Sequence, residues 1–483
     1  MKSLLFVLFL LPFTILNGQG FEKIRFGAPD TAYIGVFADE VMANKYTVLC
    51  CQYVNQIPVG GEILEYDNSG LLEKYVKLPE YSGHTLEPEK MIRSGISQLL
   101  VTGNAWDNTI DEQNLFFMTL DTLYQIQSVV IVNNPSLDDR FLNWHFINDS
   151  TVDVACKDLD SAFDKSYIMR VGLNGQIIKQ TTPGYPTGPT DFYYKKSDST
   201  YYIINSDVLF GFSADSLNPL GILFDQFAYN QSHNYPFIQT GNAFGINDSV
   251  FLTMGHYMDF SSTIPIREMG ISLWNNSFDP VILFHEGEDG YYNQCPRNSF
   301  SFIDAKNAYL SGYSMILPDG LKQKSELFEF RILVFNINIE TGVENWRRLF
   351  YSNYNAFPDY TSATSDGGCL ITGSRTDLGG IRTDMFLLKL DSSGNYTPDD
   401  VTEFQANNLD IFPNPANSYL RISSRGQIIS YSILDLSGRI LVNEKCSGNK
   451  DILIETEILT PGVYLLKARF KDGSSVVKMF LRL

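Results

Sequence analysis

The densest group of charged side chains that could do chemistry lies in the segment HEGEDGYYNQCPRN, from His285 to Asn298. Glu286, Glu288 and Asp289 supply carboxylate oxygens beside glycines, and Ca²⁺ prefers oxygen ligands of this kind. The segment lacks the Asp-x-Asp-x-Asp-Gly spacing and the final bidentate Glu of a recognised calcium loop. The three carboxylates are therefore the metal candidates of this chain, with a solvated loop between strands as the favoured alternative. No other cofactor is indicated.

The sequence contains no pattern that is typical of nucleophilic catalysis. GFSAD (211–215) and GYSMI (312–316) lack the second glycine of a nucleophile elbow, and HExxH is absent. SDGG (365–368) resembles the Asp-box of sialidases but lacks its aromatic residue, so a structural turn is favoured. The five histidines are far apart in the sequence: His84, His145, His233, His256 and His285. We expect no catalytic residue among them.

The cysteines do not predict a zinc site. They form no CxxC pair and have no histidine at ligand spacing. The six positions are Cys50, Cys51, Cys156, Cys295, Cys369 and Cys446. We expect most of them to be buried thiols.

The negative charge is concentrated in the first 407 residues. The net charge is −19, from 36 Lys and Arg against 55 Asp and Glu. Residues 408–483 hold 10 basic and 7 acidic side chains, which leaves 26 against 48 for the rest. An acidic body repels phosphate backbones, so nucleic acid is a poor partner. Cations and neutral glycans remain open as ligands.

The first 20 residues have the pattern of a cleaved secretory signal. Lys2 precedes an apolar run from Leu4 to Leu16, and Gly18 and Gly20 provide the small residues of a cleavage site before Phe21. The apolar run is shorter than the roughly 20 residues that a membrane-spanning helix needs. No later segment is long and apolar enough to cross a bilayer, so we expect an exported chain without a membrane span.

A strand motif recurs seven times between residues 46 and 373, at intervals of 49 to 61 residues. The copies are YTVLCC (46–51), QLLVTG (98–103), VDVACK (152–157), YYIINS (201–206), VFLTMG (250–255), NAYLSG (307–312) and GCLITG (368–373). Most are followed by a further apolar strand, and no helical periodicity interrupts them. A unit of about 50 residues with several antiparallel strands has the size of one propeller blade. The pattern predicts an all-β, seven-bladed β-propeller over residues 21–398, with six or eight blades, or stacked β-sandwiches, as alternatives.

The last copy, DGGCLITGSRTDLGGIRTDMFLLKLDSSGN (366–395), resembles the repeat of exported propeller-like proteins from gliding and gut bacteria of the Bacteroidota type. That repeat has Asp-Gly-Gly, a strand, Gly-Ser, a loop, and a strand that ends in Lys-Leu-Asp-x-x-Gly. The resemblance implies a fold and does not indicate a ligand.

Residues 409–483 predict a second, smaller domain after a polar linker at 399–408. LDIFPNP places two prolines after a short strand, and SYLRIS then alternates. SYSILDLSGRILVN (430–443) predicts a hairpin that turns at 435–438, and residues 459–483 predict another that turns at 471–474. Six or seven short strands in about 75 residues favour an immunoglobulin-like sandwich.

Three blocks of this domain, IFPNPANSYLRI, SILDLSGRIL and LTPGVYLLKARF…VVKMFLRL, resemble the motifs of the type A C-terminal sorting domain of the type IX secretion system. The resemblance implies export through the periplasm, contact with the outer-membrane translocon and its C-terminal signal peptidase, and release or attachment at the cell surface. Motif residues that it singles out are Pro413, Asn414, Pro415, Asp435, Gly438, Arg439, Pro461, Gly462 and Tyr464. We expect these residues to determine shape rather than chemistry.

Two functions remain open for the body. We favour a secreted or surface binding or structural propeller whose extracellular ligand is a glycan or a protein. The alternative is a secreted hydrolase with carboxylates in the propeller channel. Carboxylates with pKa shifts of opposite sense would favour the hydrolase, and aromatic and amide side chains would favour binding.

Overall fold

The computed structural model describes two compact units, residues 1–397 and 398–483. Within them it describes residues 20–26, 31–94, 98–109, 112–134, 139–158, 165–182, 191–204, 208–225, 237–247, 249–259, 266–287, 291–316, 330–350, 354–377, 383–396, 410–435, 439–470 and 475–483. The predicted signal up to residue 19 and the predicted linker lie outside these residues. No helix in the described segments has the length and apolar character needed to cross a membrane.

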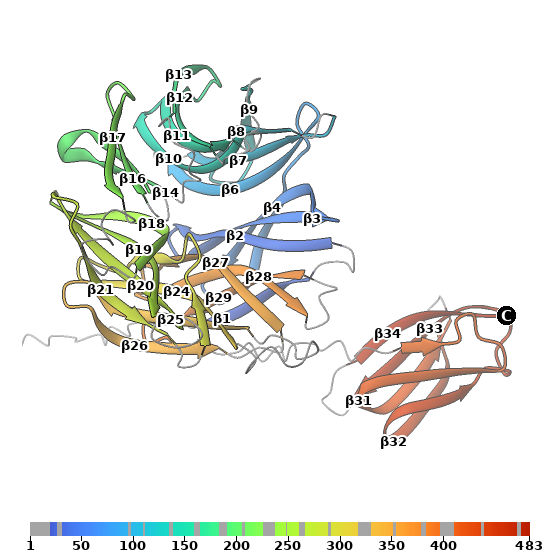
Figure 1. Cartoon of the computed structure of the whole chain (residues 1–483). Helices are drawn as coiled ribbons and strands as arrows, with labels where there is room; N and C mark the ends of the chain where they lie inside the picture. The colour runs from blue at the N-terminus through green and yellow to red at the C-terminus, as the bar shows by residue number, and fades with distance from the viewer. Residues whose placement is uncertain are drawn as a thin grey trace, which may run out of the picture. The chain divides into compact units, whose positions relative to one another are not determined.

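The first unit is built from antiparallel blades that follow one another in chain order (Figure 1). Blade 1 contains β2 (Thr31–Met42), β3 (Lys45–Val54), β4 (Ile57–Asp67) and β5 (Leu72–Lys77). Blade 2 contains β6 (His84–Ser94), β7 (Gln98–Asp107), β8 (Glu112–Asp121) and β9 (Ile126–Val132). Blade 3 contains β10 (Asp139–Asn148), β11 (Thr151–Asp158), β12 (Lys165–Gly172) and β13 (Ile177–Thr181). Blade 4 contains β14 (Asp191–Lys195), β15 (Thr200–Ile204), β16 (Val208–Ser213) and β17 (Pro219–Asp225).

The remaining three blades complete the ring. Blade 5 contains β18 (Phe237–Asn247), β19 (Val250–Asp259), β20 (Ile266–Asn275) and β21 (Pro280–Glu286). Blade 6 contains β22 (Tyr291–Gln294), β23 (Phe300–Phe302), β24 (Asn307–Ile316), β25 (Phe330–Asn338) and β26 (Val343–Phe350). Blade 7 contains β27 (Tyr354–Ala363), β28 (Cys369–Asp377), β29 (Thr383–Leu390) and the N-terminal strand β1 (Phe21–Arg25). Blades 1 to 4 and blade 7 are separate four-stranded sheets, whereas blades 5 and 6 are joined into one nine-stranded sheet by a parallel pairing of β20 with β22 at Arg267 and Tyr292. The prediction of a seven-bladed propeller is therefore confirmed.

The N-terminal strand closes the ring, which the repeat pattern did not indicate. β1 pairs antiparallel with β29, from Phe21 opposite Lys389 to Arg25 opposite Met385. Phe21 is buried together with Ala38 and Tyr46 of blade 1. One blade thus combines strands from both ends of the body, and blades 7 and 1 are held side by side (Figure 1).

The core of the body consists of seven apolar clusters, one between each pair of neighbouring blades in the described part of the chain. The seven predicted motif strands are β3, β7, β11, β15, β19, β24 and β28. Each is the second strand of its blade, except that in blade 6 two short strands, β22 and β23, precede β24 and both pair with it. Consecutive residues of such a strand point to opposite faces. Leu99 of β7 accordingly packs between blades 1 and 2, whereas Leu100 packs between blades 2 and 3. Both faces of each motif strand are buried, so its sequence is continuously apolar rather than alternating.

The second unit is a small sandwich-like β-domain. Its strands are β30 (Asp410–Phe412), β31 (Tyr419–Leu434), β32 (Ile440–Glu455), β33 (Gly462–Phe470) and β34 (Ser475–Arg482). The sheet order is β30-β31-β33-β34, and β32 pairs along the other edge of β31. The long strand β31 pairs first with β30 and then with β33, and the unit encloses its own core around Leu420, Ile433 and Leu466. Both predicted hairpins, β31–β32 and β33–β34, are present.

Candidate functional site

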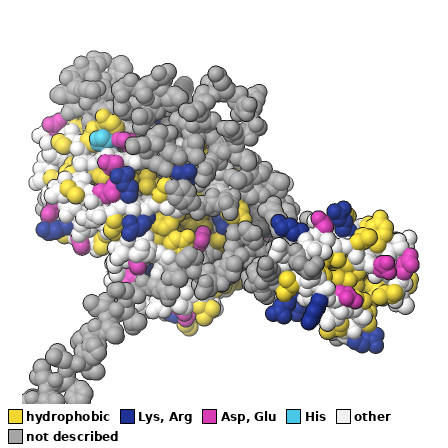
Figure 2. All heavy atoms as spheres, turned by 90° about the horizontal axis from the view of Figure 1, so that it is seen from below, with side chains coloured by type: hydrophobic (Ala, Val, Ile, Leu, Met, Phe, Trp, Pro, Cys, Tyr) yellow, Lys and Arg dark blue, Asp and Glu magenta, His cyan; other side chains and the backbone are white. Residues whose placement is uncertain are grey.

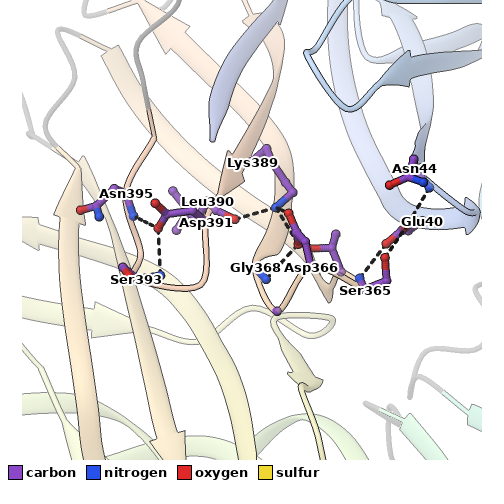
Figure 3. Close-up of polar contacts among 12 residues, drawn as sticks. Glu40, Asn44, Ser365, Asp366, Gly368, Lys389, Leu390, Asp391, Ser393 and Asn395 are labelled. Atoms are coloured by element: carbon purple, nitrogen blue, oxygen red, sulfur yellow. Dashed lines mark hydrogen bonds and ion pairs between the residues drawn. The ribbon is translucent and has the colours of Figure 1, made fainter. Parts of the chain in front are cut away.

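The consensus residues of the last repeat form a structural network in blade 7 (Figure 3). Lys389 is fully buried and donates to Asp366 Oδ2 and to the Leu390 carbonyl, each at 2.8 Å. Asp366 also accepts the Gly368 N–H at 3.0 Å. Burial alone would raise the pKa of Asp366. The hydrogen bonds from Lys389, Thr364 and the Gly368 N–H, together with the charge of Lys389, outweigh burial and lower the pKa.

The other consensus positions also have structural roles. Asp391 Oδ1 accepts the N–H groups of Ser393 and Asn395, at 2.9 and 2.8 Å, which fixes the turn after β29 (Figure 3). A Cβ at Gly368 would lie 2.1 Å from the Leu390 carbonyl oxygen, so this position admits only glycine. The Asp-Gly-Gly…Lys-Leu-Asp signature therefore stabilises a blade, because its residues form hydrogen bonds with one another and within the adjoining turn.

Carboxylates that the sequence analysis did not select lie on the first, innermost strands of blades 2 and 7. In β6 the register shifts between Pro88 and Lys90, and in β27 it shifts between Pro358 and Tyr360. The extra residues of these two bulges are Glu89 and Asp359. A glycine of the second strand lies opposite each bulge. A Cβ at Gly103 or Gly373 would approach the inner-strand carbonyl to 2.0 Å, so the glycine that ends the repeat motif makes room for the bulge.

Glu89 and Asp359 belong to the two blades on either side of blade 1. The charge of Glu89 acts on Asp359. Asp39 of β2 lies between them in ring order and feels the charge of Lys90. Lys90 Nζ donates to Asn143 Oδ1 of β10 at 2.9 Å, which extends this polar group to blade 3.

The environment of this group raises the pKa of its two aspartates. Burial, with a smaller contribution from Glu89, raises the pKa of Asp359 to about 7. Burial also raises the pKa of Asp39, against the hydrogen bond from the Glu40 N–H at 2.8 Å. Asp359 makes no hydrogen bond or ion pair with any residue in the described part of the chain. The two shifts have the same sense, and the Asn104 amide donates to Glu89 Oε1 at 3.4 Å.

The predicted calcium segment is only partly described. Glu288 and Asp289 lie outside the described residues, and Glu286 ends β21 with an oxygen 3.7 Å from Arg347 Nη1. Across the described ranges, no three His, Cys, Asp or Glu side chains are grouped closely enough to hold a metal ion. The calcium hypothesis therefore gains no support from Glu286.

Of the histidines, His233 lies outside the described residues, and the other four occupy separate places. His256 is buried and accepts the Cys295 N–H at 2.9 Å, and burial lowers its pKa to about 3. His285 stacks on Tyr257 with ring centroids 4.0 Å apart. Its Nδ1 lies 2.6 Å from Glu268, which raises its pKa. His145 packs against Tyr194, and His84 lies beside Asp107. Among the described cysteines, all five of the body are buried.

In the tail, the first and third sequence blocks meet along strand β34. Asn414 Oδ1 accepts the Leu481 N–H at 2.9 Å, and its Nδ2 donates to the Met479 carbonyl at 3.3 Å. Ala416 adds backbone hydrogen bonds to Leu481 and Leu483, at 2.7 and 2.9 Å. Pro413 and Pro415 flank Asn414 and are exposed. The prolines cannot donate backbone hydrogen bonds, and the single asparagine between them anchors the segment to β34.

The third block is fixed to the same region by Thr456, which is fully buried. Its hydroxyl donates to the Asn417 carbonyl at 2.9 Å, and its own carbonyl accepts Arg482 Nε at 3.0 Å. Tyr464 OH donates to the Thr460 carbonyl at 2.6 Å across the turn that contains Pro461 and Gly462. Thr456 and Arg482 were missed from the sequence because neither has a distinctive spacing.

The second block forms a separate turn between β31 and β32. Asp435 Oδ1 accepts the Arg439 backbone N–H, and its Oδ2 accepts the Arg439 Nε–H, both at 3.0 Å. The Arg439 carbonyl in turn accepts the Asp435 N–H. Gly438 lies outside the described residues. The sorting-motif residues that the structure describes thus lie in turns of one small domain and where its segments contact each other.

The surface of the tail carries many apolar side chains between basic ones (Figure 2). The exposed large apolar residues of this unit are Phe412, Tyr419, Ile440, Leu441, Leu453, Ile458, Val463, Met479, Leu481 and Leu483. Val463 and Leu481 are direct cross-strand partners on β33 and β34. These two side chains therefore lie next to each other on one face of the sheet.

Residues 410–482 match the family described as the secretion system C-terminal sorting domain. The tail of this chain is thus a type IX sorting domain, as the sequence predicted, and it implies export to a secreted or cell-surface location through contact with that secretion system. No curated protein matches the chain.

The chain is similar to several solved structures at very low identity. They include the WD40 domain of SCAP from fission yeast, with 8% identity, a TM-score of 0.36, and coverage of 76% of this chain and 98% of that one. The β-propeller domain of the Trilobed protease from Pyrococcus furiosus has 6% identity and a TM-score of 0.41, with coverage of 77% and 99%. The N-terminal domain of Nup159 has 9% identity and a TM-score of 0.32, with coverage of 76% and 98%. The blade count above stands on the strand order of this chain.

Proposed function

We propose that this protein is a cell-surface or secreted binding propeller, delivered by its C-terminal sorting domain through the type IX translocon. The observation that carries the proposal is the sorting-domain match at residues 410–482, joined to a body whose repeat signature is structural. The C-terminal signal peptidase of the system would then remove the tail after export. The released body would then offer a rigid, disc-shaped binding surface to its extracellular ligand, which is a glycan or a protein.

The directions of the pKa shifts on the first strands of blades 1 and 7 favour binding over hydrolysis. A general acid and its partner base need pKa values that are pushed apart, whereas those of Asp39 and Asp359 are both raised. The Asn104 amide donates to Glu89 Oε1 at 3.4 Å, and amide contacts of this kind are typical of a recognition site.

One observation favours the hydrolase as the second candidate. A carboxyl whose pKa is about 7, such as that of Asp359, is suited to general acid catalysis at neutral pH. The two candidates therefore make opposite predictions for the same side chain.

We expect the purified chain to bind at least one compound on a glycan or peptide array. We also expect it to release no product from polysaccharide and peptide substrates with calcium present. The measurement is binding on the array and turnover in solution, for the wild type and for Asp359→Ala. Product that accumulates with the wild type and is lost in Asp359→Ala, at an unchanged melting temperature, would show that the body is a hydrolase.

A further inference from the structure

We propose that one face of the sheet in the tail docks on an anionic phospholipid bilayer. This outer face is formed by residues 430–434 of β31, 440–445 of β32, 463–469 of β33 and 479–481 of β34. The inference concerns the tail alone and goes beyond the proposed function, which concerns the ligand of the body.

The two sides of this sheet are defined by the register of its strands. Ile433, Leu466 and Phe480 are buried in the core of the tail. Successive residues of a strand point to opposite sides, so the neighbours of these three residues point away from the core. The apolar side chains on this outer side are Leu434, Ile440, Val463, Leu465, Met479 and Leu481.

These apolar side chains form two adjacent rows that are open to solvent. One row crosses all four strands in register: Ile440, Leu434, Leu465 and Met479. The other row is the cross-strand pair Val463 and Leu481. Ile440 is 57% exposed and Met479 is 59% exposed. A contiguous exposed apolar area of this kind is typical of a surface that contacts a protein or a membrane.

The other half of the same face is basic. Lys467 and Arg469 continue β33 on the outer side, and Ser430 of β31 lies between Arg469 and Lys445 of β32. All three cationic side chains are exposed. None of them forms an ion pair with a residue that the structure describes. The apolar rows and the basic residues thus occupy adjoining halves of one face.

The acidic residues nearest to this face do not compensate its cations. Asp435 follows Leu434 and is paired with Arg439 at 3.0 Å. Glu444 lies opposite Tyr431, which packs against the core, so Glu444 points to the other side of the sheet. The outer face therefore presents three positive charges beside an apolar area.

The types of these side chains favour lipid over protein as the occupant. Two of the three cations are lysines, and lysine is depleted from protein–protein interfaces. At an anionic bilayer, by contrast, apolar side chains reach the acyl boundary while Lys and Arg are attracted to the lipid phosphates. Residues 408–483 carry 10 basic against 7 acidic side chains, or +3, and the rest carries 26 against 48, or −22. An anionic surface would therefore attract the tail and repel the body.

Co-sedimentation of the purified full chain with lipid vesicles tests the inference. One set of vesicles contains phosphatidylcholine alone, and the other contains equal amounts of phosphatidylcholine and phosphatidylglycerol. We expect binding to the anionic vesicles and at least about tenfold weaker binding to the neutral ones. Binding should also weaken as the salt concentration rises from about 0.1 M to about 1 M, because the screening length falls from about 10 Å to about 3 Å.

Two double variants address the two halves of the face. Lys467→Gln/Arg469→Gln removes two charges and is expected to weaken binding to anionic vesicles by more than about tenfold. Ile440→Gln/Met479→Gln replaces two exposed apolar side chains and is expected to weaken it by about tenfold, because less apolar area leaves water.

Leu453→Gln and Arg421→Gln are the matched controls. Leu453 is 64% exposed and lies opposite Arg421, which is paired with Asp451 at 3.3 Å. Both positions belong to the parts of β31 and β32 outside the outer face, so we expect binding close to that of the wild type. Circular dichroism melting curves establish that each variant is folded.

Three results would overturn the inference. They are no binding of the folded wild type to anionic vesicles, equal binding to neutral and anionic vesicles, and binding of both double variants as strong as that of the controls. Each would leave a protein as the occupant of this face. The proposed function is tested separately by the array and turnover measurements on the body, so a failure here is distinguishable from a failure there.

Discussion

Replacing Lys389 by methionine is expected to lower the free energy of unfolding of the propeller by about 3 kcal/mol. The ammonium of Lys389 is fully buried, and its three hydrogen bonds go to both oxygens of Asp366 and to the Leu390 carbonyl. Methionine keeps most of the volume but leaves the Asp366 carboxylate without its buried cation. Urea unfolding followed by tryptophan fluorescence measures the loss.

The exposed pair between Lys306 and Glu340 supplies the control. Lys306→Met removes an ammonium whose side chain is 63% exposed, so its expected cost is below about 1 kcal/mol. The loss caused by Lys389→Met should also depend on pH. The pKa of Asp366 is lowered in the folded protein, so its contribution is present above the ordinary value of 3.8 and is lost as the pH falls below it. Equal unfolding curves for the two variants at pH 7 would contradict the structural role of the repeat signature.

Deleting residues 409–483 is expected to abolish export and to leave the folded body in the periplasm. The deleted region includes the entire sorting-domain match, and the body closes its ring with its own N-terminal strand and needs no strand of the tail. Cell fractionation with antibody against the body measures where the protein accumulates. Circular dichroism of the retained fragment, with the β-sheet spectrum of the full chain, is the control for folding. Truncated protein in the medium or on the cell surface at wild-type levels would contradict the sorting role.

The sequence predicted the blades because one strand in each blade is buried on both faces. Leu99 and Leu100 contact different neighbouring blades, and this double burial makes the motif strand apolar enough to recognise. The tail was predictable for a different reason: its turns depend on Pro, Asn, Asp and Gly, whose backbone preferences are local. The first strands of blades 2 and 7 carry neither signal, because bulges interrupt the regular alternation of their side chains.

The polar group on the first strands of blades 1, 2 and 7 could not be predicted from the sequence. Asp39 and Asp359 are 320 positions apart, and their strands β2 and β27 are neighbours only because the ring closes between blades 7 and 1. Glu89 and Asp359 would count as ordinary surface acids in a regular strand. Their orientation depends on bulges, and the glycines that permit them lie 14 positions further along the chain. In the sequence these bulges are indicated by two Pro-acid pairs, 88–89 and 358–359, each of which precedes the Thr-Gly pair that ends the next motif strand.

The central claim is that the last 85 residues, 399–483, contain the export address of this protein. Its most direct test is to fuse residues 399–483 to the C-terminus of a monomeric fluorescent protein that carries a periplasmic signal, and to measure the fluorescence outside the outer membrane in cells with an active type IX system. We predict that the fusion reaches the surface or the medium and that the fluorescent protein without the tail does not. Retention of the fusion in the periplasm, in cells that export their own type IX cargo normally, would contradict the claim.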